Sequence, residues 1–544
     1  MDLPFAVSLG PGSSVADHTG TWRTERAVFI KPTAPCGASC PAGEDVRSWL
    51  YAAESGGAGY EAAWRAIMEV NPFPAVMGRV CYHPCETACN RGQLDEAVGI
   101  NSVERFLGDE ALRQGWSVTA RRPDTGRRVL VVGAGPAGLS AAYHLARAGH
   151  AVTIKEGSSQ PGGMFRYGIP RYRLPREVLD AEIKRILDLG VRLELDTDVT
   201  DLDAAIAEGP YDATFLAVGA RLGRRTYLPA ASAARIVDAV SVLRAVEEGE
   251  APLLGRRVAV YGGGNTALDA ARTARRLGAS DAIVVYRRTR ERMPAHEQEV
   301  REAEEEGIQF RWLSTIDQVD PDGITVEQME LDASGFPQPT GRTERLAADS
   351  VVLALGQDTD LSLLGTAPGL EVEDGVVMTR TSSMMTSRPG VFAGGDVAPG
   401  ERSATVALGH GRTAAEGIEA WLSGQAVAEP AAPDLAPYDS LNTWYFEDAP
   451  RQHRSQLEMV RRQTTFEEVV QSLDVDNALY EARRCLSCGG CISCDNCFAY
   501  CPDNAVIKLG PEGEYAVDLD YCKGCGLCVE ECPTGSIVMQ PEDV

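Results

Sequence analysis

The 544-residue sequence predicts a multidomain α/β protein, and three observations carry that prediction. Two stretches, residues 128–156 and 257–288, each run from an apolar strand through a glycine-rich turn into an amphipathic helix and a second strand. This order is typical of a βαβ unit in a buried parallel sheet. The third observation is that residues 485–544 contain ten of the 15 cysteines. At roughly 150 residues per domain, the length favours three to four domains.

The distribution of the cysteines indicates ligands rather than structural thiols. Five lie between Cys36 and Cys89 and ten between Cys485 and Cys532, with none in the intervening 395 residues. Disulfides need an oxidising compartment, and the N-terminus lacks a basic segment followed by an apolar core, so it does not resemble a secretory signal. We therefore expect thiolate ligands in the reducing cytoplasm.

Charge and hydropathy exclude two kinds of partner. The net charge of −26 argues against binding to nucleic acid. No run of about 18 uncharged apolar residues occurs, so the sequence predicts no membrane span.

The first glycine turn joins the strand Val129–Val132 to a helical stretch, Pro136–Ala148. Its G-x-G-x-x-G spacing permits a tight turn, close approach of the backbone to a pyrophosphate, and close packing of helix on strand. A glutamate ends the second strand, where a carboxylate can bind ribose hydroxyls. A glycine-rich turn without a ligand is the alternative. The predicted binding residues are Gly133, Gly135, Pro136, Ala137, Gly138 and Glu156.

The second glycine turn differs in how its second strand ends. Arg287 and Arg288 stand where the first unit has its acid, and arginines there can pair with a 2′-phosphate, which favours NADP. A solvated basic strand end is the alternative, because arginine also stacks on adenine. The predicted binding residues are Gly262, Gly264, Asn265, Thr266, Arg287 and Arg288.

A third, shorter signal is the apolar strand ending in Gly394-Gly395-Asp396, followed by the helical stretch Ala404–Ala415. This arrangement suits a flavin, with Asp396 bonding the ribityl chain and the helix N-terminus near Thr405 and Val406 facing the ring. Without the first turn it would fit any buried strand end.

The cysteine tail has the spacing of a two-cluster bacterial ferredoxin, in which the fourth cysteine of each run binds the other cluster. We therefore predict two [4Fe–4S] clusters, and a pair of zinc sites is the alternative. One cluster would use Cys491, Cys494, Cys497 and Cys532, and the other Cys501, Cys522, Cys525 and Cys528.

The seven remaining cysteines suggest two further sites. Cys81, Cys85 and Cys89 are evenly spaced, and Cys40, which precedes a proline, would complete a third cluster. Structural zinc fits that spacing as well. Cys36, Cys485 and Cys488 are left, and three thiolates suffice for a cluster if a carboxylate or an amide completes it. Structural and solvent-facing thiols are the alternative for these three.

The ordered set of motifs resembles the small subunit of glutamate synthase and its relatives, including the N-terminal half of dihydropyrimidine dehydrogenase. The resemblance covers roughly residues 30–425. The motifs that carry it are Gly78–Cys81, Pro84–Glu86, Cys89, Gly133–Gly138, Gly162–Met164, Tyr167–Pro170, Arg173–Pro175, Gly262–Thr266, Tyr286–Arg288, Met293–Ala295 and Ala393–Asp396.

The resemblance implies two N-terminal clusters beside FAD, one of them with Gln or Glu as an unusual fourth ligand. The matching residue is Glu104, which would join Cys36, Cys485 and Cys488; a helix-surface carboxylate is the alternative. Family members carry an Arg-Cys-x-x-Cys motif near the N-terminus. The matching motif here, with Cys485 and Cys488, lies in the tail, so the tail would have to fold back onto the N-terminal domain. The resemblance also adds Gly163, Met164, Arg173 and Gly219 to the predicted cofactor-binding residues.

These motifs divide the chain into five expected parts. They are an N-terminal helical Fe–S domain (1–125), a discontinuous Rossmann-like FAD domain (126–254 and 363–425), a Rossmann-like NAD(P) domain (255–362), a linker with a helical extension (426–484), and an α+β ferredoxin domain (485–544).

The expected function is electron transfer between NAD(P)(H), FAD and four [4Fe–4S] clusters, to or from a catalytic partner subunit, with ferredoxin-type carriers as further partners. By analogy, the partner is a 2-oxoacid oxidoreductase of phenylglyoxylate or indolepyruvate type. The alternatives are a glutamate synthase small subunit proper, against which the ferredoxin tail counts, and a relay subunit without nicotinamide activity, against which the intact Gly262–Asn265 turn counts.

Overall fold

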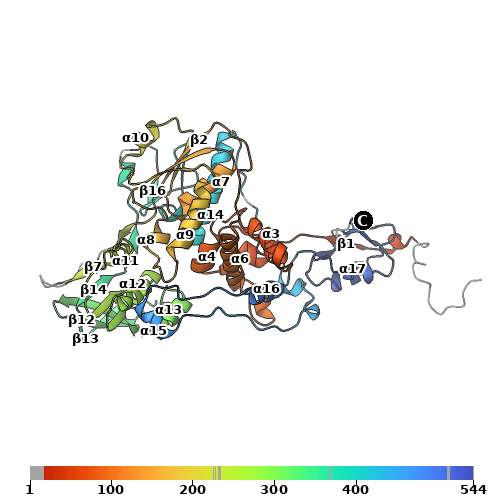
Figure 1. The fold of residues 1–544 in the computed structure, drawn as a ribbon. Coiled ribbons are helices and arrows are strands. Elements are labelled where there is room, and N and C mark those ends of the chain that lie inside the picture. The colour runs from red at the N-terminus through yellow and green to blue at the C-terminus, as the bar shows by residue number, and fades with distance from the viewer. Residues whose placement is uncertain are drawn as a thin grey trace, which may run out of the picture.

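The computed structural model describes residues 18–542, apart from 225, 227, 231–234, 366, 368, 430 and 511–514. Two domains built on parallel sheets lie at one end of the molecule, a helical domain lies in the middle, and a small lobe stands at the other end (Figure 1). The predicted α/β organisation with parallel sheets is therefore confirmed.

The helical domain contains the five N-terminal cysteines. Its second helix begins where the Asp45 carboxylate accepts a hydrogen bond from the Ser48 amide, and it buries Trp49 and Leu50 against the other helices. The helices are α1 (Pro35–Ala38), α2 (Val46–Ala53), α3 (Gly57–Ile67), α4 (Pro74–Val80), α5 (Pro84–Thr87) and α6 (Ile100–Gln114).

The first sheet contains the first glycine turn. Its five strands are all parallel, in the order β18-β5-β2-β3-β4, and α7 packs closely on α14. The strands are β2 (Arg128–Val132), β3 (Ala151–Lys155), β4 (Arg192–Glu194), β5 (Ala213–Leu216) and β18 (Val391–Ala393). The helices are α7 (Pro136–Arg147), α8 (Met164–Tyr167), α9 (Arg176–Leu187), α10 (Leu202–Ala207) and α14 (Ala404–Leu422).

The second sheet contains the second glycine turn. It is also fully parallel, in the order β10-β9-β8-β14-β7. Its strands are β7 (Ile236–Asp238), β8 (Arg257–Tyr261), β9 (Asp281–Val285), β10 (Gln309–Arg311) and β14 (Ser350–Leu353), and its helices are α11 (Ala239–Glu247), α12 (Asn265–Arg276) and α13 (Glu297–Glu305). Because β7 pairs with β14, the expected domain boundary at residue 254 is too late in the chain.

An antiparallel three-stranded sheet extends the second domain. The structure also contains two short antiparallel strand pairs. The larger sheet is β11 (Ser314–Asp320), β12 (Gly323–Leu331) and β13 (Pro337–Ala347). The short pairs are β6 (Leu222–Gly223) with β15 (Gln357–Asp358), and β16 (Val372–Glu373) with β17 (Val376–Val377).

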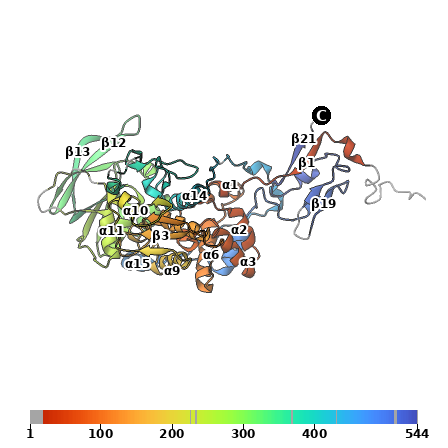
Figure 2. The ribbon, with the colours of Figure 1, turned by 90° about the horizontal axis from the view of Figure 1, so that it is seen from above.

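The small lobe is assembled from both ends of the described chain. The strand β1 (Glu25–Phe29) pairs antiparallel with β21 (Ile537–Pro541), so the N-terminal segment belongs to this lobe and not to the helical domain as expected. From above, the lobe again stands apart from the nucleotide domains (Figure 2). Its other elements are α17 (Asn496–Ala499), β19 (Val506–Lys508), β20 (Tyr515–Val517) and α18 (Leu527–Glu530).

Residues 438–484, which we call the strap, lie within the expected linker and helical extension (426–484), and they bind three domains. The Arg454 guanidinium donates to the Gly78 carbonyl at 2.8 Å in the helical domain, and the Val469 amide donates to the Tyr172 carbonyl at 2.9 Å. Arg462 pairs with Glu305 of the second nucleotide domain at 2.9 Å. The strap contains α15 (Met459–Thr464) and α16 (Val475–Arg483), and Figure 1 shows it running beneath the nucleotide domains.

Single turns of 3₁₀ helix complete the described secondary structure. They are η2 (Thr19–Trp22), η3 (Asn90–Gln93), η4 (Arg290–Arg292), η5 (Ser362–Leu364), η6 (Gly395–Val397), η7 (Tyr438–Ser440) and η8 (Thr443–Tyr445).

Candidate redox centres

The first glycine turn can be built only from glycine at its two ends. Gly133 has φ +106°, and a Cβ added at Gly138 would lie 2.0 Å from the Gly133 carbonyl oxygen. The Glu156 carboxylate accepts hydrogen bonds from the Ala134 amide at 2.7 Å and the Ser158 amide at 2.8 Å. The carboxylate therefore lies beside the turn, where the sequence placed a ribose partner.

Two other glycines show that separate segments converge on this turn. A Cβ at Gly163 would be 2.7 Å from Gly135 Cα, and one at Gly395 would be 3.1 Å from the Ala137 side chain. A Cβ at Gly219, where φ is +67°, would have no atom within 4 Å. The close approach of these glycine segments to the turn fits a bound dinucleotide.

The N-terminus of α14 connects this cradle to the cysteines. Thr405 Oγ1 donates a hydrogen bond to Cys81 Sγ at 3.1 Å, while Ser403 caps the Val406 amide. Asp396 is half-buried in η6, just after β18, and its desolvation raises the pKa of its carboxyl. The helix that was predicted to face the flavin ring therefore also touches a candidate iron ligand.

Arg173 joins the two nucleotide domains. Its guanidinium pairs with Asp269 at 2.8 Å and with Glu299, both in the second nucleotide domain. Its role as a cofactor-binding residue stays a prediction.

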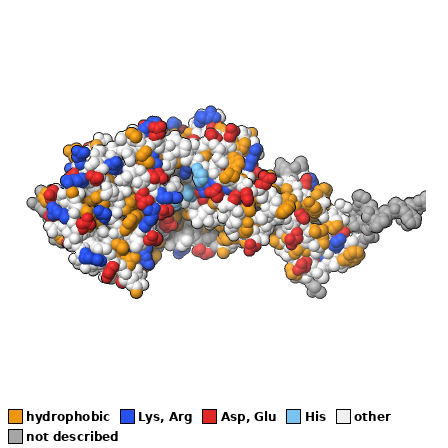
Figure 3. Space-filling view, turned by 90° about the horizontal axis from the view of Figure 1, so that it is seen from below, with side chains coloured by type: hydrophobic (Ala, Val, Ile, Leu, Met, Phe, Trp, Pro, Cys, Tyr) orange, Lys and Arg blue, Asp and Glu red, His pale blue; other side chains and the backbone are white. Residues whose placement is uncertain are grey.

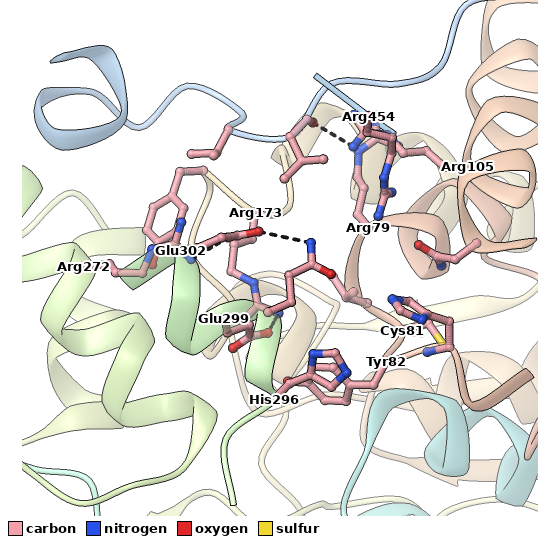
Figure 4. A pocket seen from close by; sticks show the side chains of 17 residues that line it. Arg79, Cys81, Tyr82, Arg105, Arg173, Arg272, His296, Glu299, Glu302 and Arg454 are labelled. Atoms are coloured by element: carbon pink, nitrogen blue, oxygen red, sulfur yellow. Dashed lines mark hydrogen bonds and ion pairs between the residues drawn. The ribbon is translucent and has the colours of Figure 1, made fainter. Parts of the chain in front are cut away.

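Arg173 also lines a polar pocket between the nucleotide domains and the helical domain (Figure 4). There the Tyr82 ring stacks on the His296 ring, with centroids 5.1 Å apart. His296 in turn donates its amide to Asn265 Oδ1 at 2.8 Å, so the second glycine turn is in contact, through one residue, with the segment that follows Cys81.

The second glycine turn leaves space for a nucleotide. Gly262 has φ +148°, where a Cβ would lie 2.1 Å from the Ala354 carbonyl oxygen, and a Cβ at Gly264 would meet no atom within 4 Å. Gln357 donates to Thr266 Oγ1 at 3.2 Å. The turn therefore fits the pyrophosphate role predicted for it.

The two arginines beyond β9 remain available to a ligand. Arg288 Nε is buried and has no hydrogen-bond partner, and the Arg287 guanidinium lies 5.9 Å from the centre of the Phe336 ring. Arg292, which sequence reasoning missed, donates to the Gly335 carbonyl at 3.3 Å in the same neighbourhood. The signal that could have revealed it is a run of four arginines in six residues, which Arg292 ends.

The structure regroups the N-terminal cysteines. Burial, followed by the charges of Cys89 and Cys488, raises the pKa of the Cys36 thiol to about 12. Burial and then the charge of Cys36 raise the pKa of Cys485. The Asn90 amide also donates to Cys488 Sγ at 3.5 Å. We call this group the middle set: Cys36, Cys89, Cys485 and Cys488.

Glu104 belongs with the other three cysteines. Burial, and then the charge of Glu104, raise the pKa of Cys81 to about 12. Burial and the charge of Glu86 raise the pKa of Cys85, and the charges of Cys81, Cys40 and Glu104 raise it further. We call this group the flavin-side set: Cys40, Cys81, Cys85 and Glu104.

These neighbours favour an exchange of Cys89 and Glu104 between the two expected groups. The expectation paired Cys89 with Cys81 and Cys85 because the three are evenly spaced. In the fold, α5 ends at Thr87, and Cys89 follows it as a neighbour of Cys36 and Cys485. The predicted return of the tail is present, because Cys485 and Cys488 lie beside Cys36.

Glu104 is a buried carboxyl and not a surface residue. It is 6% exposed on α6, accepts a hydrogen bond from Asn71 at 2.9 Å, and has a pKa that burial and the charge of Glu44 raise well above the usual value. A buried carboxylate without a cation partner is costly, and a bound metal would offset that cost.

The tail cysteines meet in the two crossed groups that the spacing predicts. Two separate hollows in the lobe are each lined by four of them. The inner tail set is Cys491, Cys494, Cys497 and Cys532. The outer tail set is Cys501, Cys522, Cys525 and Cys528. Within the described residues, no three metal-binding side chains converge closely enough to hold a single ion.

Comparison with known proteins agrees with this geometry. The family model described as pyridine nucleotide-disulphide oxidoreductase matches residues 127–411, more than half of the chain. The chain belongs to this family. Residues 17–116 of this oxidoreductase also match the family model described as dihydropyrimidine dehydrogenase domain II, 4Fe-4S cluster. Residues 490–536 match the family model described as 4Fe-4S dicluster domain. The iron–sulfur interpretation of both cysteine regions is therefore confirmed over zinc.

Three curated relatives extend the comparison. The oxidoreductase is 35% identical to NADP(+)-dependent formate dehydrogenase subunit beta of Moorella thermoacetica, over 84% of this chain and 70% of the relative. It is 33% identical to NADPH-Fe(3+) oxidoreductase subunit beta of Geobacter sulfurreducens, over 84% and 75%. It is 34% identical to the glutamate synthase (NADPH) small chain of Azospirillum brasilense, over 72% and 87%. The resemblance to the glutamate synthase small chain is thus confirmed.

The assignment of Glu104 and Cys89 to different sets can be tested by substitution. We expect Glu104→Ala and Cys89→Ser to weaken the electron paramagnetic resonance signals of two different clusters, because each removes a ligand from a different set. Glu110→Ala, near the end of the same helix α6, should change neither signal. Loss of the same signal in both variants would restore the grouping expected from spacing.

Proposed function

We propose that this FAD-dependent NAD(P)H oxidoreductase with [4Fe–4S] domains is the electron-transfer subunit of a larger complex. Four clusters would connect its flavin to a partner catalytic subunit. When bound, the flavin exchanges a hydride with the nicotinamide and single electrons with the clusters. The observation that carries the proposal is that the four ligand sets lie in one continuous series.

The series follows from ligands that neighbouring sets contribute on shared segments. Thr405, at the flavin-facing helix, bonds Cys81 of the flavin-side set. From there, each set has a ligand three or four residues from a ligand of the next. The linking pairs are Cys36 and Cys40, Cys85 and Cys89, Cys488 and Cys491, Cys497 and Cys501, and Cys528 and Cys532.

The protein's own residues position and shield these centres. Thr405 Oγ1 and the His83 amide both donate hydrogen bonds to Cys81 Sγ, which favours the thiolate form that binds iron. The Asn90 side chain does the same for Cys488. Strap residues such as Arg451, which pairs with Glu86 at 2.5 Å, hold the tail ligands against the helical domain.

The partner and compartment are also proposals. The curated relatives named above are subunits, which supports a complex. We favour a 2-oxoacid oxidoreductase of phenylglyoxylate or indolepyruvate type, with a formate dehydrogenase as the second candidate because of the 35% identical relative. No described helix combines the length and the apolar composition of a membrane span. The reducing cytoplasm is the compartment that suits 15 free cysteines.

Anaerobic stopped-flow mixing with NADPH tests the function. We expect the flavin absorbance to bleach first and the cluster absorbance to follow within the same chain. Bleaching of the flavin without the clusters would break the series, and bleaching of neither by NADPH or NADH would leave a relay subunit without nicotinamide activity.

We also propose NADP as the preferred nucleotide. Replacing both Arg287 and Arg288 with Ala should weaken NADP⁺ binding by about 1.5–3 kcal/mol for each charge-assisted bond lost, and should leave NAD⁺ binding nearly unchanged. Equilibrium titration with each nucleotide measures the difference, and Arg342→Ala, on the exposed strand β13, is the matched control. Equal losses for both nucleotides would show that these arginines hold adenine or the pyrophosphate.

A further inference from the structure

An open groove lies between the strap and the lobe, and no residue of the four ligand sets lines it. One wall is the strap around η7 and η8, and the other is α18 and β21. The groove encloses about 760 Å³. Its apolar lining includes Leu441, Trp444, Phe446, Val529 and Ile537.

Three aromatic side chains lie exposed at the edge of the groove and beside it. Trp444 is 89% exposed, and it is followed by Tyr445, whose hydroxyl bonds the Glu531 carboxylate and the Tyr500 hydroxyl. Tyr500 is about half exposed. We call these three residues the aromatic face. Exposed Trp and Tyr side chains gathered beside a groove are typical of protein–protein interfaces.

The acidic charge around the groove favours a basic partner. Asp439 and Glu530 line the groove, Glu531 borders it, and no Lys or Arg is among the lining residues. Residues 485–544 as a whole contain ten acidic residues and two lysines. Figure 3 shows hydrophobic and acidic side chains together on the surface of the lobe. A complementary partner is therefore basic around an apolar centre.

The groove lies beside the tail sets. It shares Ile537 with the hollow that the inner tail set lines, and its wall α18 carries Cys528 of the outer tail set. Tyr500 of the aromatic face directly precedes Cys501, also of the outer tail set. A protein seated in the groove would therefore lie beside the ligand sets of the lobe.

We propose that the groove and the aromatic face dock the redox partner of this subunit, a protein that presents an apolar side chain within a basic surface. Trp444 is the main anchor, and the acidic rim orients the partner. The proposal rests on the proposed function, because it assumes that electrons leave or enter through the lobe. It adds the surface and the chemistry of the protein that exchanges them.

The test uses the complex purified through a tag on the full chain. A photo-crosslinking amino acid in place of Trp444 should crosslink to a basic segment of a subunit that carries its own redox centre. The same amino acid in place of Leu253, which is 80% exposed on a nucleotide domain, should not. Crosslinking at position 444 to residues 1–17 of the same chain, or to a second copy, would overturn the proposal.

A kinetic measurement separates docking from the chemistry before it. In Trp444→Glu, we expect NADPH-driven reduction of the partner's centre to slow at least tenfold, while flavin and cluster reduction in the isolated chain keep their rates. Leu253→Glu should behave as the unmodified protein. An unchanged rate of partner reduction in Trp444→Glu would refute the docking site. Failure of NADPH to reduce the clusters of the unmodified chain would instead refute the proposed function.

Discussion

A chain that ends at about residue 480 should lose three clusters and not two. The inner and outer tail sets go with the tail, and the middle set cannot assemble because Cys485 and Cys488 supply half of its ligands. Iron should therefore fall from about 16 to about 4 atoms per chain, since each cluster holds four. The flavin-side set and FAD should survive, because none of their ligands lies beyond residue 480.

Anaerobic iron and flavin analysis measures this result, and a full-length variant provides the control. Cys485→Ser combined with Cys488→Ser keeps the strap and the lobe in place, so it should lose only about 4 of about 16 irons. A truncated chain that retains about 8 irons would show that Cys36 and Cys89 find other ligands. The tail would then be a tethered, independent ferredoxin.

Glu306→Ala should cause the largest loss of stability. The Glu306 carboxylate is 0% exposed and pairs with Arg272 and Arg276, each at 2.7 Å, and with Arg462 of the strap. Removing it leaves three guanidinium groups without this partner in a buried site, and breaking a buried pair costs about 3–5 kcal/mol. For a domain of roughly 150–250 residues, we expect a loss of this magnitude to lower the thermal midpoint of unfolding by roughly 10 °C.

The same carboxylate gives this stability a pH dependence. Burial alone would raise the pKa of Glu306, but hydrogen bonds from Arg272 and Arg276 lower it to about 2. The folded protein therefore holds a carboxylate that ionises more readily than in the unfolded chain. Its stabilisation is complete above about pH 4.5 and is lost as the pH falls toward about 2.

Differential scanning calorimetry of the full chain measures both effects. Glu304→Ala, on the same helix but paired with the more exposed Arg290, is the matched control and should shift the midpoint little. A midpoint for Glu306→Ala that matches the unmodified protein would show that the strap is not anchored through this network.

Local spacing explains why part of the site could be predicted from sequence. The glycine turns and the crossed pairing of the tail cysteines depend on residues only a few positions apart, so the pattern alone determines the local geometry. The glycine contacts at Gly133 and Gly138 and the two hollows in the lobe agree with those predictions.

Contacts between distant segments could not be predicted in the same way. The contacts favour an exchange of Cys89 and Glu104 relative to the expectation, because the neighbours of each residue depend on tertiary packing and not on local spacing. β1 pairs with a strand more than 500 residues away, and Glu25–Phe29 shows no alternation that would indicate a strand. Arg173 was assigned by resemblance alone, and its carboxylate partners lie in another domain.

One flavin and four clusters should form a connected series within a single chain. Anaerobic titration with dithionite, followed by absorbance and electron paramagnetic resonance, counts the electrons that the chain accepts. We expect about six electrons, two for the flavin and one for each cluster, with spin coupling between neighbouring clusters. Uptake of about four electrons or fewer, in protein with its full content of iron and flavin, would contradict this expectation.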